Sequence, residues 1–300
     1  MQKKFKRVRS PFRYPGAKTR ILDKIIGSME HHLQSTESFV DVFVGGGSVS
    51  LQVASMFPSI KEMYLNDLDI GIHCFWECLS KPKLMKQLCS IIEKTDASLD
   101  AFLSVKNSDN KKSSCVTNAF NAIFLNRTTF SGIMDAGPIG GMKQQSKWDV
   151  GCRYNQKALV GLIEKINSEV GPSINSMNMH FSDLIDTLDD GERVFYFDPP
   201  YYHKGNDLYR VKMSIDDHVL LSSMVRDMKS PWVMSYDYCD EIIEMYEWAS
   251  INTIDMRTSI NGKKDNWTEK KELIITKKEK KIKSVDFEQK SAIIQQKEKL

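Results

Sequence analysis

Apolar runs that end abruptly in polar or glycine-rich turns recur along the chain, and they predict strands. We expect seven strands, at residues 38–44, 62–65, 179–181, 194–198, 231–236, 251–256 and 273–276. A glycine turn follows the first of them, and acidic residues end the second, third and fourth. Stretches with helical spacing lie between most strands, whereas only a polar loop joins the last two. The pattern predicts a Rossmann-like α/β fold whose final two strands form an antiparallel pair.

This alternation is interrupted over residues 70–175. The interruption begins with stretches of helical spacing and continues as a polar, glycine-broken segment in which aromatic and basic residues are interleaved. Such a segment inside a compact domain is typical of a functional insert, and a flexible surface insert is the alternative. We therefore divide the chain into a sheet domain at residues 1–80 and 174–276, an insert at 81–173 and a charged tail at 277–300.

The charge of the chain is nearly balanced but unevenly placed. The 300 residues are 41% hydrophobic, as expected for a globular protein, and carry a net charge of +3. Residues 1–20 contain eight basic and no acidic side chains, and residues 104–157 contain eight basic and three acidic ones. Basic patches on a nearly neutral protein suit a polyanionic partner, and a solvated basic surface is the alternative.

The six cysteines are scattered without CxxC spacing, and the histidines do not cluster with them. We therefore predict no metal site and expect reduced thiols in a cytoplasmic protein. The basic amino terminus is followed by no apolar segment, so we predict no signal peptide. No apolar run approaches membrane-spanning length, and we expect no membrane association.

A glycine turn, Gly45-Gly46-Gly47-Ser48, lies between the first predicted strand and a helical stretch. Glycines allow a ligand to approach the backbone, and the start of the helix offers free N–H groups. The spacing of the glycines matches neither a dinucleotide-binding fingerprint nor a P-loop. A role in packing alone is the alternative to ligand binding by this turn. Asp67 ends the second strand about twenty residues later, where an acid is placed to bind ribose hydroxyls. A helix N-cap is the alternative role for Asp67.

The motif Asp198-Pro199-Pro200-Tyr201 ends the buried fourth strand. The exocyclic amine of adenine or cytosine is a poor nucleophile because its lone pair is delocalised into the ring. Asp198 and the Pro199 carbonyl can accept both N–H bonds and free that lone pair, and Pro200 restricts where the carbonyl points. The Tyr201 ring can stack on the base. An ordinary proline turn is the alternative for this motif alone.

Four motifs together carry a resemblance to a known family. They are Arg-Tyr-Pro-Gly-Ala-Lys at 13–18, Asp-Val-Phe-Val-Gly-Gly-Gly-Ser at 41–48, Leu-Asn-Asp-Leu-Asp at 65–69 and Asp-Pro-Pro-Tyr at 198–201. Over residues 11–276 the chain resembles the alpha-class adenine-specific DNA methyltransferases, which include bacterial and phage GATC-type enzymes. The resemblance implies an S-adenosylmethionine-dependent methyltransferase fold with a seven-stranded sheet that contains one antiparallel strand. It also implies that residues 81–173 form a helical target-recognition domain.

By the same resemblance, Asp198, Pro199 and Tyr201 are the catalytic residues. The implied contacts to S-adenosylmethionine are Tyr14, Lys18, Asp41, Gly45, Gly47, Asp67, Phe181, Asp183 and Asp198. Among them, Asp67 binds the ribose, while Phe181 and Asp183 form the wall around the adenine of the cofactor. Tyr14 stands where many members have tryptophan, and Asp41 stands where many have glutamate.

We expect four residues of the insert to contact DNA. Asn126, Arg127 and Arg153 lie in its family-like stretches, and Lys143 belongs to the segment of interleaved aromatic and basic residues. The expected reaction is methyl transfer to the N6 amine of an adenine flipped out of double-stranded DNA. Methylation of cytosine N4 is the nearest alternative, and a catalytically silent DNA-binding factor is an alternative of another class. The DNA sequence that is read, the presence of a cognate restriction endonuclease, the oligomeric state and the role of the tail stay open. We expect no stable protein partner.

Overall fold

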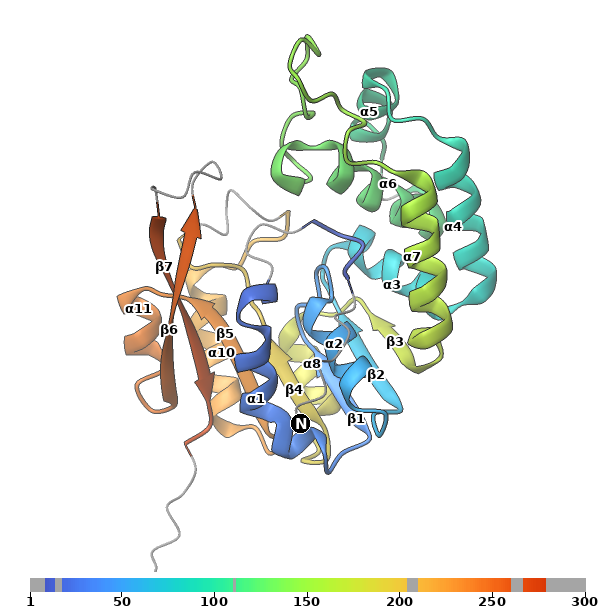
Figure 1. Cartoon of the computed structure of the whole chain (residues 1–300). Coiled ribbons are helices and arrows are strands. Elements are labelled where there is room, and N and C mark those ends of the chain that lie inside the picture. The colour runs from blue at the N-terminus through green and yellow to red at the C-terminus, as the bar shows by residue number, and fades with distance from the viewer. Residues whose placement is uncertain (1–8, 14–17, 110–111, 204–209, 260–266, 279–300) are drawn as a thin grey trace, which may run out of the picture.

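The structure of the protein, a computed structural model, describes residues 9–13, 18–109, 112–203, 210–259 and 267–278. Within these residues, one seven-stranded sheet carries helices on both faces, and a group of helices lies beside one of its edges (Figure 1). The described helices include none that is long and apolar enough to cross a membrane. The predicted α/β sheet is confirmed.

The sheet is parallel except for one strand. Its strands, in chain order, are β1 (Ser38–Asp41), β2 (Glu62–Asn66), β3 (Ile174–Met177), β4 (Val194–Phe197), β5 (Trp232–Asp237), β6 (Ser250–Ser259) and β7 (Trp267–Thr276). Their spatial order is β3-β2-β1-β4-β5-β7-β6, and β7 runs antiparallel to both of its neighbours. The chain therefore winds in opposite directions from β1 and from β4, and the gap between their carboxyl ends is the topological switch point.

Alternating side chains of the strands enter two separate cores. Phe39, Tyr196 and Val233 point to one face of the sheet. Val40 and Phe195 point to the other. Both faces are apolar because helices cover both, as expected for a mainly parallel sheet. The covering helices of the first core include α1 (Leu22–Leu33) and α2 (Ser48–Met56), and those of the second are α8 (Phe181–Leu188), α10 (Ile215–Asp227) and α11 (Asp240–Met245).

Helices between β2 and β3 form the group beside the sheet (Figure 1). They are α3 (Ile70–Ser80), α4 (Pro82–Lys94), α5 (Leu99–Lys106), α6 (Cys115–Thr128) and α7 (Gln156–Glu169). Side chains of Asp69, Ser98, Ser114 and Asn155 cap α3, α5, α6 and α7 by accepting hydrogen bonds from backbone N–H groups. Helix α3 packs on β3 and on α6, and so connects this group to the sheet.

Two expectations about this region need correction. The third strand was expected at residues 179–181, but it lies at Ile174–Met177 and residues 181–188 form helix α8. Phe181, Leu184 and Ile185 of α8 are buried on one side, so the apolar residues there follow the helical period and not the strand period. Helices α5 and α7 were also not expected, although Leu159, Val160, Ile163 and Ile166 of α7 recur with helical spacing. The division at residues 81 and 173 stays a prediction.

Candidate active site

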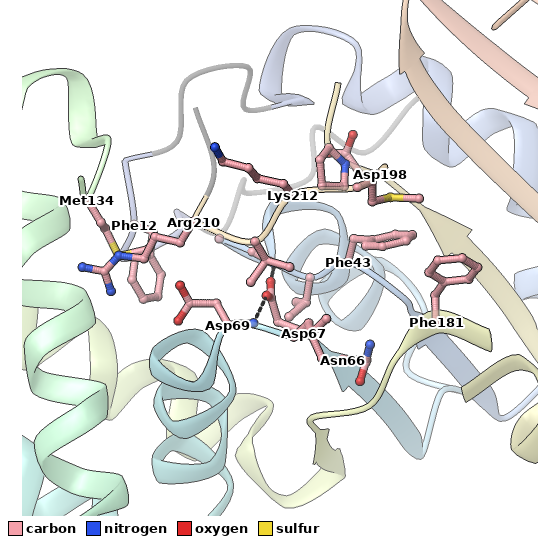
Figure 2. A pocket seen from close by; sticks show the side chains of 18 of the residues that line it. Phe12, Phe43, Asn66, Asp67, Asp69, Met134, Phe181, Asp198, Arg210 and Lys212 are labelled. Carbon is pink, nitrogen blue, oxygen red and sulfur yellow. Dashed lines mark hydrogen bonds between the residues drawn. The ribbon is translucent and has the colours of Figure 1, made fainter. Parts of the chain in front are cut away.

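The largest concentration of predicted site residues surrounds a cavity of about 240 Å³ at the switch point between β1 and β4. Of the predicted residues, Lys18, Gly45, Gly47, Asp67, Phe181 and Asp198 line it. Figure 2 shows Phe43 and Phe181 at one end, Phe12, Met134 and Arg210 at the other, and Asp67 between them. The cavity thus joins the sheet domain to residues 132–135 of the insert.

The glycine turn brings backbone, and not side chains, to the cavity. Gly47 has a φ of +64°, and a Cβ placed on it would lie 2.3 Å from the ring of the buried Trp76. The Trp76 indole N–H donates a hydrogen bond of 3.1 Å to the carbonyl oxygen of Gly45. The turn therefore has a packing role against Trp76 in addition to exposing backbone along the cavity.

Asp67 is held rigidly at the cavity by backbone donors. One carboxylate oxygen accepts the N–H of Gly45 at 2.9 Å, and the other accepts the N–H of Asp69, also at 2.9 Å. Burial, and then the neighbouring charge of Asp69, raise the pKa of Asp67 to about 7. The N-cap of α3 is Asp69, whose carboxylate accepts the N–H groups of Gly71 and Ile72, so Asp67 is left to face the cavity.

Asp41 lies in the interior rather than on the cavity wall. Its side chain is 2% exposed, and one oxygen accepts a hydrogen bond from the Ser50 hydroxyl. The other oxygen is buried without a hydrogen-bond partner. Burial raises the pKa of Asp41 to about 8. The predicted contact of Asp41 with the cofactor stays a prediction, and the structure places this group behind the cavity.

An aromatic wall closes one end of the cavity. The rings of Phe43 and Phe181 lie 6.0 Å apart between centroids, and both line the cavity. Asn66 braces this end, because its side chain bonds to the backbone of Val42 and to both backbone groups of Met179. Asp183 is exposed in the first turn of α8 and does not line the cavity, since the predicted strand end is a helix start. Tyr14 lies outside the described residues.

Asp198 sits directly after β4 with its side chain 29% exposed. Its Oδ1 lies 3.0 Å from Lys18 Nζ and accepts a hydrogen bond of 3.1 Å from the Ser235 hydroxyl of β5. The Tyr196 hydroxyl lies 2.7 Å from the same Ser235 oxygen, so it donates to Ser235. Burial raises the pKa of Asp198, and the nearby charge of Lys18 opposes that rise.

Lys18 is buried among two carboxylates and a phenol. Besides Asp198, Nζ lies 3.2 Å from Glu272 Oε2 and 3.3 Å from the Tyr201 hydroxyl, and it lies 4.8 Å from the centre of the Tyr201 ring. The Tyr201 hydroxyl donates to Glu272 Oε1 at 3.1 Å. Desolvation lowers the pKa of Lys18, but the charge of Asp198, followed by Tyr201 and Glu272, outweighs it and raises that pKa well above its ordinary value.

Sequence reasoning missed Glu272 and Ser235, which complete this network. Glu272 is 1% exposed on β7 and begins the apolar run of that strand. In the sequence Glu272 ends a charged stretch, Glu269-Lys270-Lys271-Glu272, so nothing in the local pattern indicated that it is buried. The serine of β5 carried no signal of its own, because its role depends on its position beside β4 in the sheet.

The predicted DNA contacts fall into two groups. Asn126 is fully buried: its Oδ1 accepts the Arg13 N–H at 2.7 Å, and its Nδ2 donates to the carbonyls of Arg13 and Gly132 at 2.9 Å each. Arg127 is half-buried and donates to the carbonyl of Pro11, and burial lowers its pKa to about 10. Both side chains therefore hold the segment before residue 14 against the insert.

Arg153 and Lys143, by contrast, are exposed. The Arg153 guanidinium lies 5.6 Å from the centre of the Trp148 ring, and Lys147 Nζ lies 5.5 Å from it. Trp148 is itself 54% exposed. Exposed cations around an exposed aromatic ring are typical of a nucleic-acid surface.

Residues 14–260 match the family described as D12 class N6 adenine-specific DNA methyltransferase. The chain belongs to this family. No curated protein matches it significantly. Among solved structures, a precorrin-6y C5,15-methyltransferase from Geobacter metallireducens GS-15 is 10% identical, covering 89% of this chain and 94% of that chain, with a TM-score of 0.43.

Family membership decides the main alternatives raised by the sequence. A D12 class methyltransferase uses S-adenosylmethionine, and its product is N6-methyladenine in DNA, so the cytosine-N4 reaction and the silent DNA-binding factor are set aside. The residues at the cavity suit that cofactor. Asp67 offers oxygens with spare lone pairs, Phe43 and Phe181 offer ring faces, and the glycine turn leaves the backbone accessible.

Proposed function

We propose that the cavity holds S-adenosylmethionine and a flipped adenine next to each other, and that Asp198 and the Pro199 carbonyl accept the two N–H bonds of the adenine amine. One observation supports this most directly. The ammonium of Lys18 lies 3.0 Å from Asp198 and 4.8 Å from the Tyr201 ring centre. A cationic N–H donor therefore already makes the two contacts that we expect of the target base.

In this proposal the cofactor supplies an electrophilic methyl group on a positively charged sulfur. Asp67 binds its ribose hydroxyls, and Phe43 and Phe181 enclose its adenine. The glycine turn and Lys18 lie along the rest of the cavity. Asp183 is too exposed to share in the aromatic wall, and we assign that wall to Phe43 instead.

Asp198 has two tasks in the proposed reaction. Its negative charge stabilises the positive charge that develops on the amine nitrogen as the new N–C bond forms. Its raised pKa then suits it to take the proton that the methylated nitrogen must lose. Pro199 is buried and is followed by Pro200, which restricts the backbone and so fixes the second acceptor.

Tyr201 is buried in this structure, with its ring beneath the Lys18 ammonium. Stacking of the target base on Tyr201 therefore requires Lys18 to withdraw from the ring. Glu272 provides a place for it, because Lys18 Nζ is already within 3.2 Å of that carboxylate. We infer that Lys18 exchanges Asp198 for Glu272 as its main partner when the base enters.

The DNA is bound, in our proposal, as a duplex across the insert and the mouth of the cavity. The exposed cations Arg153, Lys143 and Lys147 contact its phosphates, and Trp148 contacts the bases or sugars. Whether a companion restriction endonuclease accompanies the protein stays open.

The test replaces Asp198 with alanine and measures transfer of a tritiated methyl group from S-adenosylmethionine to plasmid DNA. We expect the rate to fall by at least about 100-fold, because an acceptor and a charge are lost at once. Asp186→Ala on the exposed side of α8 is the matched control and should keep full activity. Digestion of the DNA to nucleosides should show N6-methyladenine. Full activity of Asp198→Ala would exclude the proposed role.

A further inference from the structure

Three side chains that the catalytic proposal does not use meet beyond the carboxyl ends of β4 and β5. They are His203, six positions after Phe197 of β4, and Cys239 and Glu241 at the start of α11. One imidazole nitrogen, the thiol sulfur and one carboxylate oxygen all lie within 4.8 Å of one another. His203 Nε2 and Glu241 Oε2 are 3.2 Å apart. Among the described residues, this is the group of three potential ligands that lies close enough to hold one ion.

The three donors suit zinc better than a hard cation. Zn²⁺ binds thiolate sulfur, imidazole nitrogen and carboxylate oxygen in tetrahedral sites, whereas Mg²⁺ and Ca²⁺ prefer oxygen ligands. Bonds of about 2.0–2.3 Å place neighbouring ligand atoms of such a tetrahedron roughly 3.3–3.7 Å apart. The observed group therefore needs a movement of only about 1 Å to reach that geometry, and its members differ in how easily they can move.

Cys239 is buried, whereas His203 and Glu241 are exposed. The thiol is thus fixed by the core, and the two exposed side chains are free to adjust around an ion that enters from solution. Burial, and then the negative charges of Asp237 and Glu241, raise the pKa of the Cys239 thiol to about 11. The same negative surroundings attract a dication. When the metal–sulfur bond forms, the thiol proton is released to solvent.

We propose that His203, Cys239 and Glu241 bind one Zn²⁺ ion, with water as the fourth ligand. The structural consequence of Zn²⁺ binding follows from the position of His203, which lies two residues after Tyr201. An ion shared by the three residues ties the chain that leaves the catalytic motif to the junction between β5 and α11. The site is a structural clamp on the active-site segment and takes no part in methyl transfer.

No motif pointed to this site, because His203 is separated from the other two ligands by more than thirty positions. Motifs for zinc are recognised by short spacings between paired ligands, and here the pairing arises only when β4 and β5 lie side by side. The prediction that the chain has no metal site is therefore replaced by this proposal.

The test titrates the full-length protein, stripped of metal with a chelator, with ZnCl₂ in a calorimeter and with CoCl₂ in a spectrophotometer. We expect one Zn²⁺ per chain and a cobalt–thiolate charge-transfer band. Cys239→Ser should abolish the band, and His203→Ala and Glu241→Gln should each weaken Zn²⁺ binding by more than about tenfold. Zn²⁺ should also raise the melting temperature of the wild type, because it binds the folded state.

Two controls separate this site from other thiols and carboxylates. Glu244→Gln changes an exposed acid on the same helix, and Cys152→Ser removes a thiol of the insert. Both should bind Zn²⁺ like the wild type. Because His203 and Glu241 are exposed, we expect their variants to fold. Zn²⁺ binding by these two variants therefore still decides the question if the Cys239→Ser protein fails to fold. Zn²⁺ binding that is unchanged in His203→Ala and Glu241→Gln, or equally lost in the controls, would overturn the proposal whether or not the protein methylates DNA.

Discussion

Lys18 and Asp198 form an ion pair with 3.0 Å between Nζ and Oδ1, although they lie 180 positions apart in the sequence (198 − 18). Lys18 also contacts Glu272 of β7, so one buried ammonium is shared by two carboxylates. This sharing allows Asp198 to release Lys18 without leaving a buried charge unpaired, which would be strongly unfavourable. Glu272 is therefore as important to the proposed mechanism as the acid that touches the base.

Replacing Glu272 with glutamine tests this arrangement. The variant keeps the shape of the side chain but removes the second negative charge from Lys18, so we expect the free energy of unfolding to fall by about 2–4 kcal/mol. Lys18 should then hold Asp198 more tightly and compete with the adenine amine, which lowers kcat for methyl transfer. Urea denaturation and steady-state kinetics measure both effects. Glu247→Gln, an exposed acid after α11, is the control. Unchanged kcat in a folded Glu272→Gln protein would show that Lys18 need not move.

Sequence reasoning could place the catalytic motif because each of its parts is local. Asp198, the prolines and Tyr201 are contiguous, and the apolar run before them shows that they end a strand. The glycine turn and Asp67 are likewise set by strand ends, and parallel strands bring such ends to one edge of the sheet. Asp198, Pro200, the glycine turn and Asp67 line a single cavity, whereas Pro199 and Tyr201 are buried beside it and do not line it.

The partners across the sheet could not be predicted in the same way. Glu272 meets Lys18 only because β7 runs antiparallel beside β5, and no pattern in the sequence fixes that neighbour. Asp183 was misplaced for a related reason: a short apolar run suits a strand and a helix equally, and here the helix was formed. Asn126 was expected on the DNA surface, yet burial can be judged only once the amino-terminal segment is placed over it.

Gly47 provides a prediction about the turn itself. Alanine at this position must adopt a φ of +64° and place its Cβ 2.3 Å from the Trp76 ring. Backbone strain and a steric clash therefore both destabilise the variant. We expect a loss of about 2–4 kcal/mol in the free energy of unfolding and weaker binding of S-adenosylmethionine. Gly27→Ala in α1 has open space around the new Cβ and should instead stabilise the protein by up to about 1 kcal/mol. Denaturant titration distinguishes them; equal stability of the two variants would contradict the reported packing of the turn.

The protonation of Asp67 should make cofactor binding depend on pH. Its pKa is about 7, raised by burial and by Asp69, so the carboxylate is half protonated near neutral pH. A ribose hydroxyl donates more strongly to the ionised form, and affinity for S-adenosylmethionine should therefore rise as the pH increases from about 6 to 8. The free energy of unfolding without cofactor should change in the opposite sense. Asp67 binds its proton more tightly in the folded state than in the unfolded state, where its pKa is 3.8. Protonation of Asp67 therefore stabilises the folded state at low pH, and this stabilisation is lost as the pH rises toward 7.

Calorimetric titration with S-adenosylmethionine across this range measures the first effect. Asp67→Asn should bind more weakly and show a flatter dependence, since the titrating group is gone. Asp69→Asn removes the neighbouring charge and should move the midpoint of the wild-type dependence to lower pH while preserving its shape. An affinity that is constant between pH 6 and 8 in the wild type would argue against a ribose contact by Asp67.

Asn126 and Arg153 should separate structural from DNA-binding roles within the insert. Arg153 is exposed beside Trp148, so Arg153→Ala should leave the free energy of unfolding unchanged and weaken DNA binding. The slope of log K for DNA binding against log salt concentration should become shallower by about the amount that one phosphate contact contributes. Asn126→Ala deletes three buried hydrogen bonds and leaves the Arg13 backbone unpaired, so we expect a loss of about 2–4 kcal/mol in stability. Fluorescence anisotropy with labelled duplex over a salt series, together with denaturation, measures both properties. An Asn126→Ala protein of wild-type stability that no longer binds DNA would mean that this amide contacts the duplex after all, and that the amino-terminal segment moves aside to expose it.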